Sequence, residues 1–374
     1  MHTTLESPIK SKYTMYGAHF SLYSGKLRAY LVNKGLTFDE VLSTASMFRR
    51  VIIPKTGVRF IPVLETPEGV CLQDTAAIID ALEARHPSPR LLPATPKQHL
   101  FCRLFELYAD EWLLIAAMHY RWNHDNFPFV YQEFGSLAAP RAPAFIRSFI
   151  GKRLGAKFRG FVPLLGITDA TIPSIEAWFE EHVLAELERV LSGQPYLLGE
   201  APSVADCALM GPLYAHIFRD PGSGKIMRRR APHVAAWVER MNRPPATGGQ
   251  WCSDDAIPEP LKVLLQGALR DFWPVLTNTV AALADWAEGR PKGEELPRAL
   301  GQTAFSVNGV EGTRVMQSFH VWKLQRVIDA YEATIDSDAR ASVDRWLAEI
   351  GGSDAVNIAI PRRVERLNNR IVLA

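Results

Sequence analysis

Cysteine is scarce in this chain, and the cysteines lie far apart. The four are Cys71, Cys102, Cys207 and Cys252, and no pair has the spacing of a zinc site or of a redox motif. We therefore expect no disulfide framework. Free thiols of this kind fit a reducing compartment, and we expect a cytoplasmic protein.

A metal-ligand pattern is also missing. His119, His124 and Asp125 lie near one another in the sequence, but their spacing matches no recognised ligand set. We expect no bound metal.

Long apolar runs and a strong net charge are absent as well. No run is long enough to cross a bilayer, and the first residues, "MHTTLESPIKSKY", lack the apolar stretch of a signal peptide. The 42 basic and 40 acidic residues nearly cancel, which leaves a net charge of +2. We interpret local basic runs such as "MRRR" (227–230) and "PRRVER" (361–366) as solvated faces, and we expect neither a nucleic-acid nor a membrane partner.

The length and composition of the chain are sufficient for several folded domains. Hydrophobic residues make up 47% of its 374 residues and charged residues 22%, both ordinary for a globular protein, and the length predicts two or three domains. The pattern changes character twice, and we predict units over residues 1–93, 97–250 and 251–374.

The first unit reads as a small α/β domain. A strand is predicted over residues 12–20, a helix over 22–34 that Gly35 ends, and a second strand near 38–43. A hairpin follows over 58–72 around the turn "TPEG", and then a helix over 75–85 that Asp74 and Thr75 can cap.

The second unit is mostly helical. Phe101, Phe105, Tyr108 and Trp112 recur at helical spacing, and Ser203 with Asp206 forms the pattern of a capping box. The proline-rich residues 126–145 are predicted to be a long loop or a disordered excursion.

The third unit follows a boundary at "RPPATGGQ" (243–250) and also reads mostly as helix. Its exception is residues 303–315, where Asn308-Gly309 between two β-prone runs predicts a hairpin.

Four stretches together resemble the cytosolic glutathione transferase superfamily. They are "SLYSGKLRAYLVNKGL" from Ser21, "FIPVL" around Pro62, "DTAAIIDALE" from Asp74, and "YLLGEAPSVADCAL" around Ser203. The resemblance implies a thioredoxin-like N-terminal domain and an all-helical second domain, with residues 251–374 as an additional, mostly helical extension. It also implies a detoxifying transferase that binds glutathione as co-substrate. A homodimer is a further implication of the resemblance.

The resemblance also implies a set of site residues. Ser21 falls at the activating position. The glutathione site would contain Tyr23, Phe60, Ile61, Pro62, Asp74 and Thr75, with Pro62 cis and the backbone of Ile61 pairing with the peptide. Tyr108 and Trp112 are candidates for the second-substrate pocket, although such a stripe is more often core. The basic group for the glycyl carboxylate stays open between Lys55 and Arg59.

Ser21 has two interpretations that the residues alone leave open. It can cap the helix that follows, or its hydroxyl can donate to the glutathione thiolate. Such a donor contributes about 1.5–3 kcal/mol and a helix N-terminus about 0.3–1 kcal/mol. Together they would bring a thiol pKa from about 8.5 to about 7 or below, where the reactive thiolate dominates. Tyr16 and Tyr23 are neighbouring hydroxyls that could do the same.

Two other functions remain open. A glutathione-dependent lyase, dehalogenase or isomerase would use the same activated thiol with a different second substrate. A non-catalytic binding module would keep the fold, and the additional C-terminal residues favour that alternative.

Overall fold

The fold begins with a four-stranded sheet. The computed structural model describes residues 12–123, 126–245 and 249–374. The strands lie in the order β2-β1-β3-β4, with β1 parallel to β2 and β3 antiparallel to both β1 and β4. Their bounds are Tyr13–Gly17 for β1, Phe38–Leu42 for β2, Val63–Glu65 for β3 and Cys71–Gln73 for β4. The expected hairpin is β3 and β4, and it starts later than predicted because the residues around Pro62 form a loop.

Helices complete this first unit. They are α1 (Leu22–Asn33), α2 (Ala45–Met47), a π-helical turn (Phe48–Ile52), α3 (Ile53–Thr56) and α4 (Thr75–Arg85). The apolar faces predicted from helical spacing are buried, namely Leu27, Tyr30 and Leu31 of α1 and Ile78, Ile79 and Leu82 of α4. Strand, helix, strand, hairpin and helix form the expected thioredoxin-like domain.

The second unit is helical, as predicted. Its α-helices are α5 (Pro96–Leu107), α6 (Leu114–Asn123), α7 (Phe129–Ala138), α8 (Ala144–Arg159), α9 (Ile172–Ala177), α10 (Leu184–Leu191), α11 (Val204–Pro212), α12 (Pro221–Arg230) and α13 (Pro232–Met241). Shorter π-helical or 3-10 segments are Tyr108–Trp112, Pro163–Leu165, Trp178–Val183 and Leu213–Phe218. The capping box at the start of α11 is confirmed: Ser203 N donates to Asp206 at 2.9 Å, and Asp206 N donates to Ser203 Oγ at 3.4 Å.

The prediction of a loop or disordered excursion over residues 126–145 is wrong. Most of this segment lies in α7 and in the start of α8. Pro128 and Pro143 each stand directly before a helix, where a missing N–H is tolerated. The two helices approach so closely that a Cβ added to Gly151 would lie 1.7 Å from the Tyr131 carbonyl oxygen. Tertiary packing between helices, which no local pattern reports, therefore overrides the proline signal.

The third unit is built from helices and two hairpins. The helices are a 3-10 turn (Ser253–Asp255), α14 (Glu259–Asp271), α15 (Trp273–Ala287), α16 (Phe319–Glu332) and α17 (Ser337–Glu349), and the strands are β5 (Ala299–Val307), β6 (Val310–Gln317), β7 (Val364–Leu367) and β8 (Arg370–Leu373). β5 and β6 pair antiparallel around Asn308 and Gly309, which have φ of 48° and 80°, so the predicted Asn-Gly hairpin is present. Of the expected boundary, residues 246–248 lie outside the described residues.

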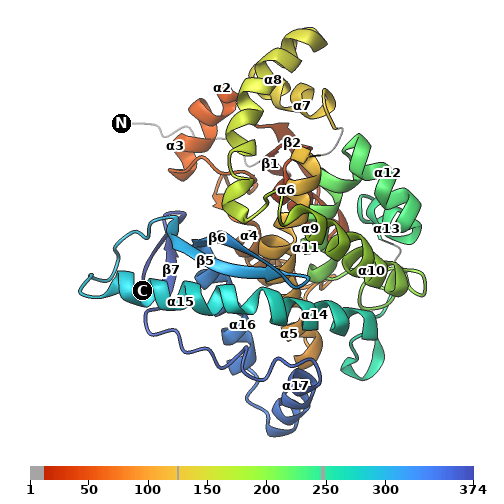
Figure 1. Cartoon of the computed structure of the whole chain (residues 1–374), viewed down its shortest axis with the longest axis vertical. Helices are drawn as coiled ribbons and strands as arrows, with labels where there is room; N and C mark the ends of the chain where they lie inside the picture. Colours follow the sequence, from red (N-terminus) through yellow and green to blue (C-terminus); the bar gives the residue numbers. More distant parts are fainter. Residues whose placement is uncertain (1–11, 124–125, 246–248) are drawn as a thin grey trace, which may run out of the picture.

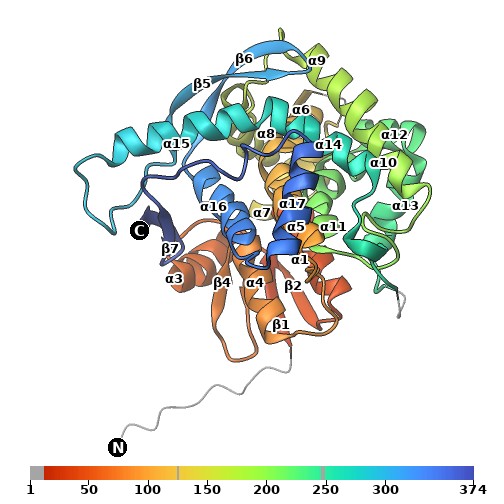
Figure 2. The ribbon, with the colours of Figure 1, turned by 90° about the horizontal axis from the view of Figure 1, so that it is seen from below.

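The third unit wraps around the other two. In Figures 1 and 2, α16 and α17 lie beside α5. In Figure 2, β7 lies close to α3 and β4 of the first unit. One continuous cluster of buried apolar residues includes Leu27 of α1, Phe105 of α5 and Leu324 of α16. The extension therefore shares the core of the other two units. None of the described helices has the length and apolarity that crossing a bilayer requires.

Candidate functional site

The strand register brings three predicted site segments to one end of the sheet. Tyr16 pairs with Val63, and Val63 pairs with Gln73. The chain therefore leaves β1 toward Ser21, enters β3 from Pro62 and leaves β4 toward Asp74 at the same end. The Ile61–Pro62 peptide bond is cis, as the resemblance implied.

Ser21 caps helix α1, and this role leaves its hydroxyl proton available. The side chain of Ser21, partly exposed, accepts from Ser24 N at 3.4 Å. Among the described residues its proton has no protein acceptor. Ser24 Oγ also only accepts, from Ala18 N at 3.2 Å, but Ser24 is fully buried and Ser21 is not. Capping uses a lone pair and activation of a thiolate would use the proton, so the two interpretations are compatible.

The tyrosine hydroxyls near Ser21 are committed to protein acceptors. Tyr23 donates to the Asp110 carbonyl at 3.2 Å, and Tyr16 donates to Glu65 Oε2 at 2.7 Å. Burial, and then the neighbouring carboxylates, hold the pKa of both hydroxyls above its ordinary value. Ser21 is therefore the better placed of the three to donate to a bound thiolate.

The turn into α4 presents Asp74 and Thr75. Asp74 has a positive φ of 74°, and its Oδ1 accepts from Ala76 N at 2.9 Å and Ala77 N at 3.0 Å. Thr75 is buried at the first position of the helix. Asp74 therefore caps α4, and its carboxylate lies at the same end of the sheet as Ser21.

The residues left open for the glycyl carboxylate differ in what they contact. Lys55 Nζ lies 2.9 Å from Glu65 Oε2, while Arg59 is exposed. Phe60 is also exposed, and the guanidinium of Arg298 lies 4.3 Å above its ring. Arg298 belongs to the third unit, so the extension reaches the loop that leads to Pro62.

A buried ion cluster joins the extension to the first two units. Lys26 Nζ of α1 lies 2.8 Å from Glu106 Oε1 and 2.6 Å from Asp110 Oδ2, and Lys323 Nζ of α16 lies 2.6 Å from the same Asp110 oxygen. Arg326 of α16 adds a contact of 3.2 Å to Glu106. Burial disfavours the charge on Lys323, but Asp110 and the other carboxylates raise its pKa, so Lys323 is cationic.

The extension also contacts the turn before Asp74. Arg366 Nη1 donates to the Gln73 carbonyl at 2.8 Å, and Nη2 donates to Gln73 Oε1 at 2.7 Å. Asn369 donates to the Thr56 carbonyl at 2.9 Å. Burial opposes ionisation of Asp74, but the positive charges of Lys323 and then Arg366 lower its pKa.

These contacts were missed from the sequence, and one interpretation needs correction. Arg366 belongs to the basic run 361–366, interpreted above as a solvated face, whereas its side chain is partly buried against Gln73. The only local signal was the excess of basic residues in that run.

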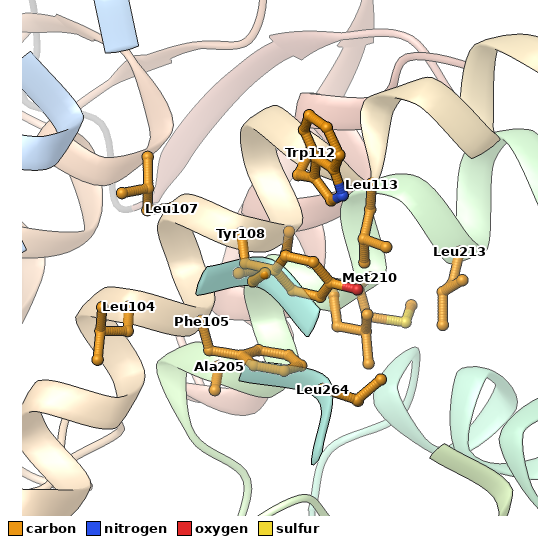
Figure 3. Packing of buried hydrophobic residues seen from close by; sticks show 14 of the residues in the cluster. Leu104, Phe105, Leu107, Tyr108, Trp112, Leu113, Ala205, Met210, Leu213 and Leu264 are labelled. Carbon is orange, nitrogen blue, oxygen red and sulfur yellow. The ribbon is translucent and has the colours of Figure 1, made fainter. Parts of the chain in front are cut away.

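Tyr108 and Trp112 lie in the hydrophobic core (Figure 3). Trp112 stacks on Phe272 with ring centroids 5.1 Å apart, and the guanidinium of Arg314 lies 5.1 Å from its centroid. Tyr108 packs against Phe105 at 5.7 Å. Their assignment to a second-substrate pocket stays a prediction, and the burial of both rings weighs against it.

The residues considered for a metal make other contacts or are not described. His119 Nε2 lies 2.9 Å from Glu176 Oε1, while His124 and Asp125 lie outside the described residues. In the described part of the chain, no three His, Cys, Asp or Glu side chains gather as metal ligands would.

Sequence comparison matches two ranges of the chain to one family. The family described as "Glutathione S-transferase, N-terminal domain" matches residues 15–90, and the one described as "Glutathione S-transferase, C-terminal domain" matches residues 168–245. These two ranges are domains of the glutathione S-transferase superfamily. The residues between them, with α5 to α8, and the extension lie outside the two matches.

A curated relative covers only part of this glutathione S-transferase homologue. The uncharacterized GST-like protein YibF of Escherichia coli (strain K12) is 29% identical over 96 residues, which make up 26% of this chain and 48% of that protein. The chain thus spans about half the length of that relative.

Solved structures of similar fold include two bacterial proteins. The β-etherase LigF from Sphingobium sp. strain SYK-6 is 21% identical, with 62% of this chain and 95% of that chain covered and a TM-score of 0.44. A glutathione S-transferase from Rhodospirillum rubrum F11 is 16% identical, with 67% and 97% covered and a TM-score of 0.41. Sequence identities and TM-scores this low support no conclusion about the activity of this chain.

Proposed function

We propose that the chain is a glutathione transferase in which Ser21 stabilises the glutathione thiolate. The observation that carries the proposal is the Ser21 hydroxyl at the N-terminus of α1, its lone pair used for capping and its proton available. The α1 N-terminus adds its partial positive charge to the same place. The fold and the family support this proposal, and the residues of the loop around Pro62 and of the Asp74 turn would form the rest of the site.

The tripeptide would bind along the end of the sheet. The backbone of Ile61 would pair with it, with Phe60 and Pro62 shaping the loop. Asp74 would accept from the ligand's ammonium group and Thr75 would hold the γ-glutamyl carboxylate. Tyr23 would line the site beside Ser21 as a neutral side chain.

The reaction would be a substitution at an electrophilic carbon. The ionised sulfur attacks that carbon, a carbon–sulfur bond forms, and the leaving group departs with the bonding electron pair. Holding sulfur and carbon together would supply much of the remaining rate. The second substrate would be an electrophilic, largely apolar small molecule.

The test replaces the hydroxyl while sparing the helix cap. Ser21→Gly removes the hydroxyl, and glycine at an N-cap loses only a few tenths of a kcal/mol. We expect glutathione to bind with little change by calorimetry, the pKa of its bound thiol to rise toward about 8.5, and turnover of an aryl halide to fall about 10- to 100-fold. Ser21→Thr, which keeps the hydroxyl, is the matched control. Full activity of Ser21→Gly would refute the role of this residue.

A binding module is the second candidate, because Arg366 and Asn369 of the extension fasten the elements around the site. Retention on glutathione resin without turnover of the aryl halide would favour this alternative or a more specialised glutathione-dependent lyase, dehalogenase or isomerase.

The expected homodimer stays a prediction. Any such dimer would have to avoid the surfaces of α4 and α5 that α16 covers, since Arg326 of α16 contacts both Asp80 and Glu106.

A further inference from the structure

The segment between α7 and α9 carries an unusual excess of positive charge. From Phe134 to Thr168 the chain has six basic residues and no acidic one, although the net charge of the whole chain is only +2. The basic residues are Arg141, Arg147, Lys152, Arg153, Lys157 and Arg159. Most of them are exposed on or beside α8. A strongly basic surface of this kind calls for an anionic partner.

The same segment exposes large apolar side chains. Phe145 is 74% exposed, Phe149 59%, Phe161 51% and Phe158 47%, and Ile146 and Leu164 are exposed as well. These six make up half of the large apolar residues found exposed in the described part of the chain. Scattered single residues need no explanation, but a gathering on one helix and the turn after it does.

The inner face of α8 is already occupied. Gly151 packs against the backbone of α7, and Gly155 faces the ring of Trp122. In Figure 1, α7 and α8 stand at the edge of the molecule, with α8 projecting from it. Except for Phe158, which packs partly on α7, the exposed aromatic and basic residues of α8 therefore belong to a face that this chain does not cover.

Aromatic and basic side chains alternate on that face. The guanidinium of Arg153 lies 4.5 Å from the centroid of the Phe149 ring. Lys152, next to Arg153, and Lys157, one helical turn further on, are exposed. Exposed phenylalanine side chains can enter the boundary between headgroups and acyl chains, while the neighbouring lysine and arginine side chains meet anionic headgroups, so this face suits the surface of an anionic membrane. A nucleic-acid duplex would match the charge but would leave the apolar side chains without a partner.

We propose that the α8 surface, defined as α8 with the turn as far as Leu164, docks on membranes that carry anionic lipid headgroups. The binding would be peripheral, through one face of one helix. It replaces the expectation that the protein has no membrane partner.

An aromatic path connects this surface to the loop before α1. Phe158 of α8 packs on Phe134 of α7 with ring centroids 4.9 Å apart, and Phe134 packs on Phe20 at 5.0 Å. Phe20 directly precedes Ser21. If the proposed function holds, docking would bring the Ser21 loop near the membrane, and the second substrate would belong to the lipophilic electrophiles that partition there.

The experiment is sedimentation of the full chain with vesicles of phosphatidylcholine alone and of phosphatidylcholine with phosphatidylglycerol. We expect binding to the anionic vesicles, weakened by salt, and little binding to the neutral ones. Lys152→Gln/Lys157→Gln should lower the partition coefficient on the order of tenfold. Lys225→Gln/Arg229→Gln on α12 removes the same charge elsewhere and should change it little. Phe149→Ser should lower the binding that persists at high salt.

Three outcomes would overturn the proposal. They are the absence of binding to anionic vesicles at low salt, equal loss in the two double variants, and tighter binding to an oligonucleotide duplex that depends on the same lysines. Glutathione affinity measured by calorimetry should be unchanged in every variant. If the vesicle experiment shows no docking, the proposed glutathione transferase function is unaffected. If Ser21→Gly keeps full activity, the vesicle result is equally unaffected.

Discussion

Lys323 and Lys26 contact the same carboxylate oxygen, Asp110 Oδ2, each at 2.6 Å. One lysine belongs to the extension and the other to the first helix of the thioredoxin-like domain. Asp110 belongs to the helical domain, so a single buried oxygen joins three parts of the chain. Buried ions need such partners because removing them from water is costly.

Lys323→Met should destabilise the protein. The substitution removes one of two cationic partners of Asp110, and we expect the free energy of unfolding to fall by about 1–3 kcal/mol in urea titrations. Arg363→Gln is the control, because its pair with Asp329 is exposed and should contribute about 0.5 kcal/mol or less. A Lys323→Met variant as stable as the parent would contradict the importance of this cluster.

Glu106 of the ion cluster should also make the protein sensitive to acid. Burial disfavours ionisation of Glu106, but Lys26, Arg326 and Lys323 hold its pKa well below the ordinary 4.5. Because its pKa is lower in the folded chain, Glu106 stabilises the fold above about pH 4.5, and that contribution is lost as the pH falls toward the folded-state pKa.

We therefore expect the free energy of unfolding to decline as the pH falls below about 4.5, and the decline to be smaller in Glu106→Gln. Urea titrations at a series of pH values measure this. Glu365→Gln, an exposed position on β7, should keep the steeper decline of the parent. Equal slopes in the parent and Glu106→Gln would show that other groups govern acid unfolding.

Arg366→Met should weaken glutathione binding if the proposed site is correct. The arginine holds Gln73 by two hydrogen bonds, and Gln73 directly precedes Asp74. Loosening that turn should raise the dissociation constant measured by calorimetry about five- to tenfold. Arg370→Gln, in the same hairpin but paired with the exposed Glu295, should bind like the parent. Unchanged affinity in Arg366→Met would separate the extension from the site.

Two glycine substitutions should have opposite effects on stability. Gly151→Ala would force its new Cβ against the Tyr131 carbonyl, so the α7–α8 contact must open and the melting temperature should fall. Gly267→Ala, in α14, has no atom within 4 Å of the new Cβ and should stabilise by about 0.5–1 kcal/mol. Thermal unfolding of both variants measures the contrast. A stabilised Gly151→Ala would mean that the two helices are less tightly packed than described.

The sequence was most informative where signals are local. The turn at Asn308 and Gly309 and the caps at Ser203 and Asp74 depend on residues within a few positions of one another, and the structure has all three. The placement of Pro62 required the family pattern, since its geometry has no local signature.

The rest depends on contacts between distant residues. Arg366 meets Gln73 across 293 positions, and Lys323 meets Asp110 across 213. No periodicity reports such pairs. The α7–α8 pair was missed for a related reason: Gly151 is a helix weakener in isolation and a close-packing residue only opposite Tyr131.

The bond between Arg366 and Gln73 has a consequence for how the chain is made. Gln73 is translated 293 residues before Arg366, so these two hydrogen bonds can form only after β7 has been synthesised. Until then the turn before Asp74 lacks the partner that holds it in the folded chain.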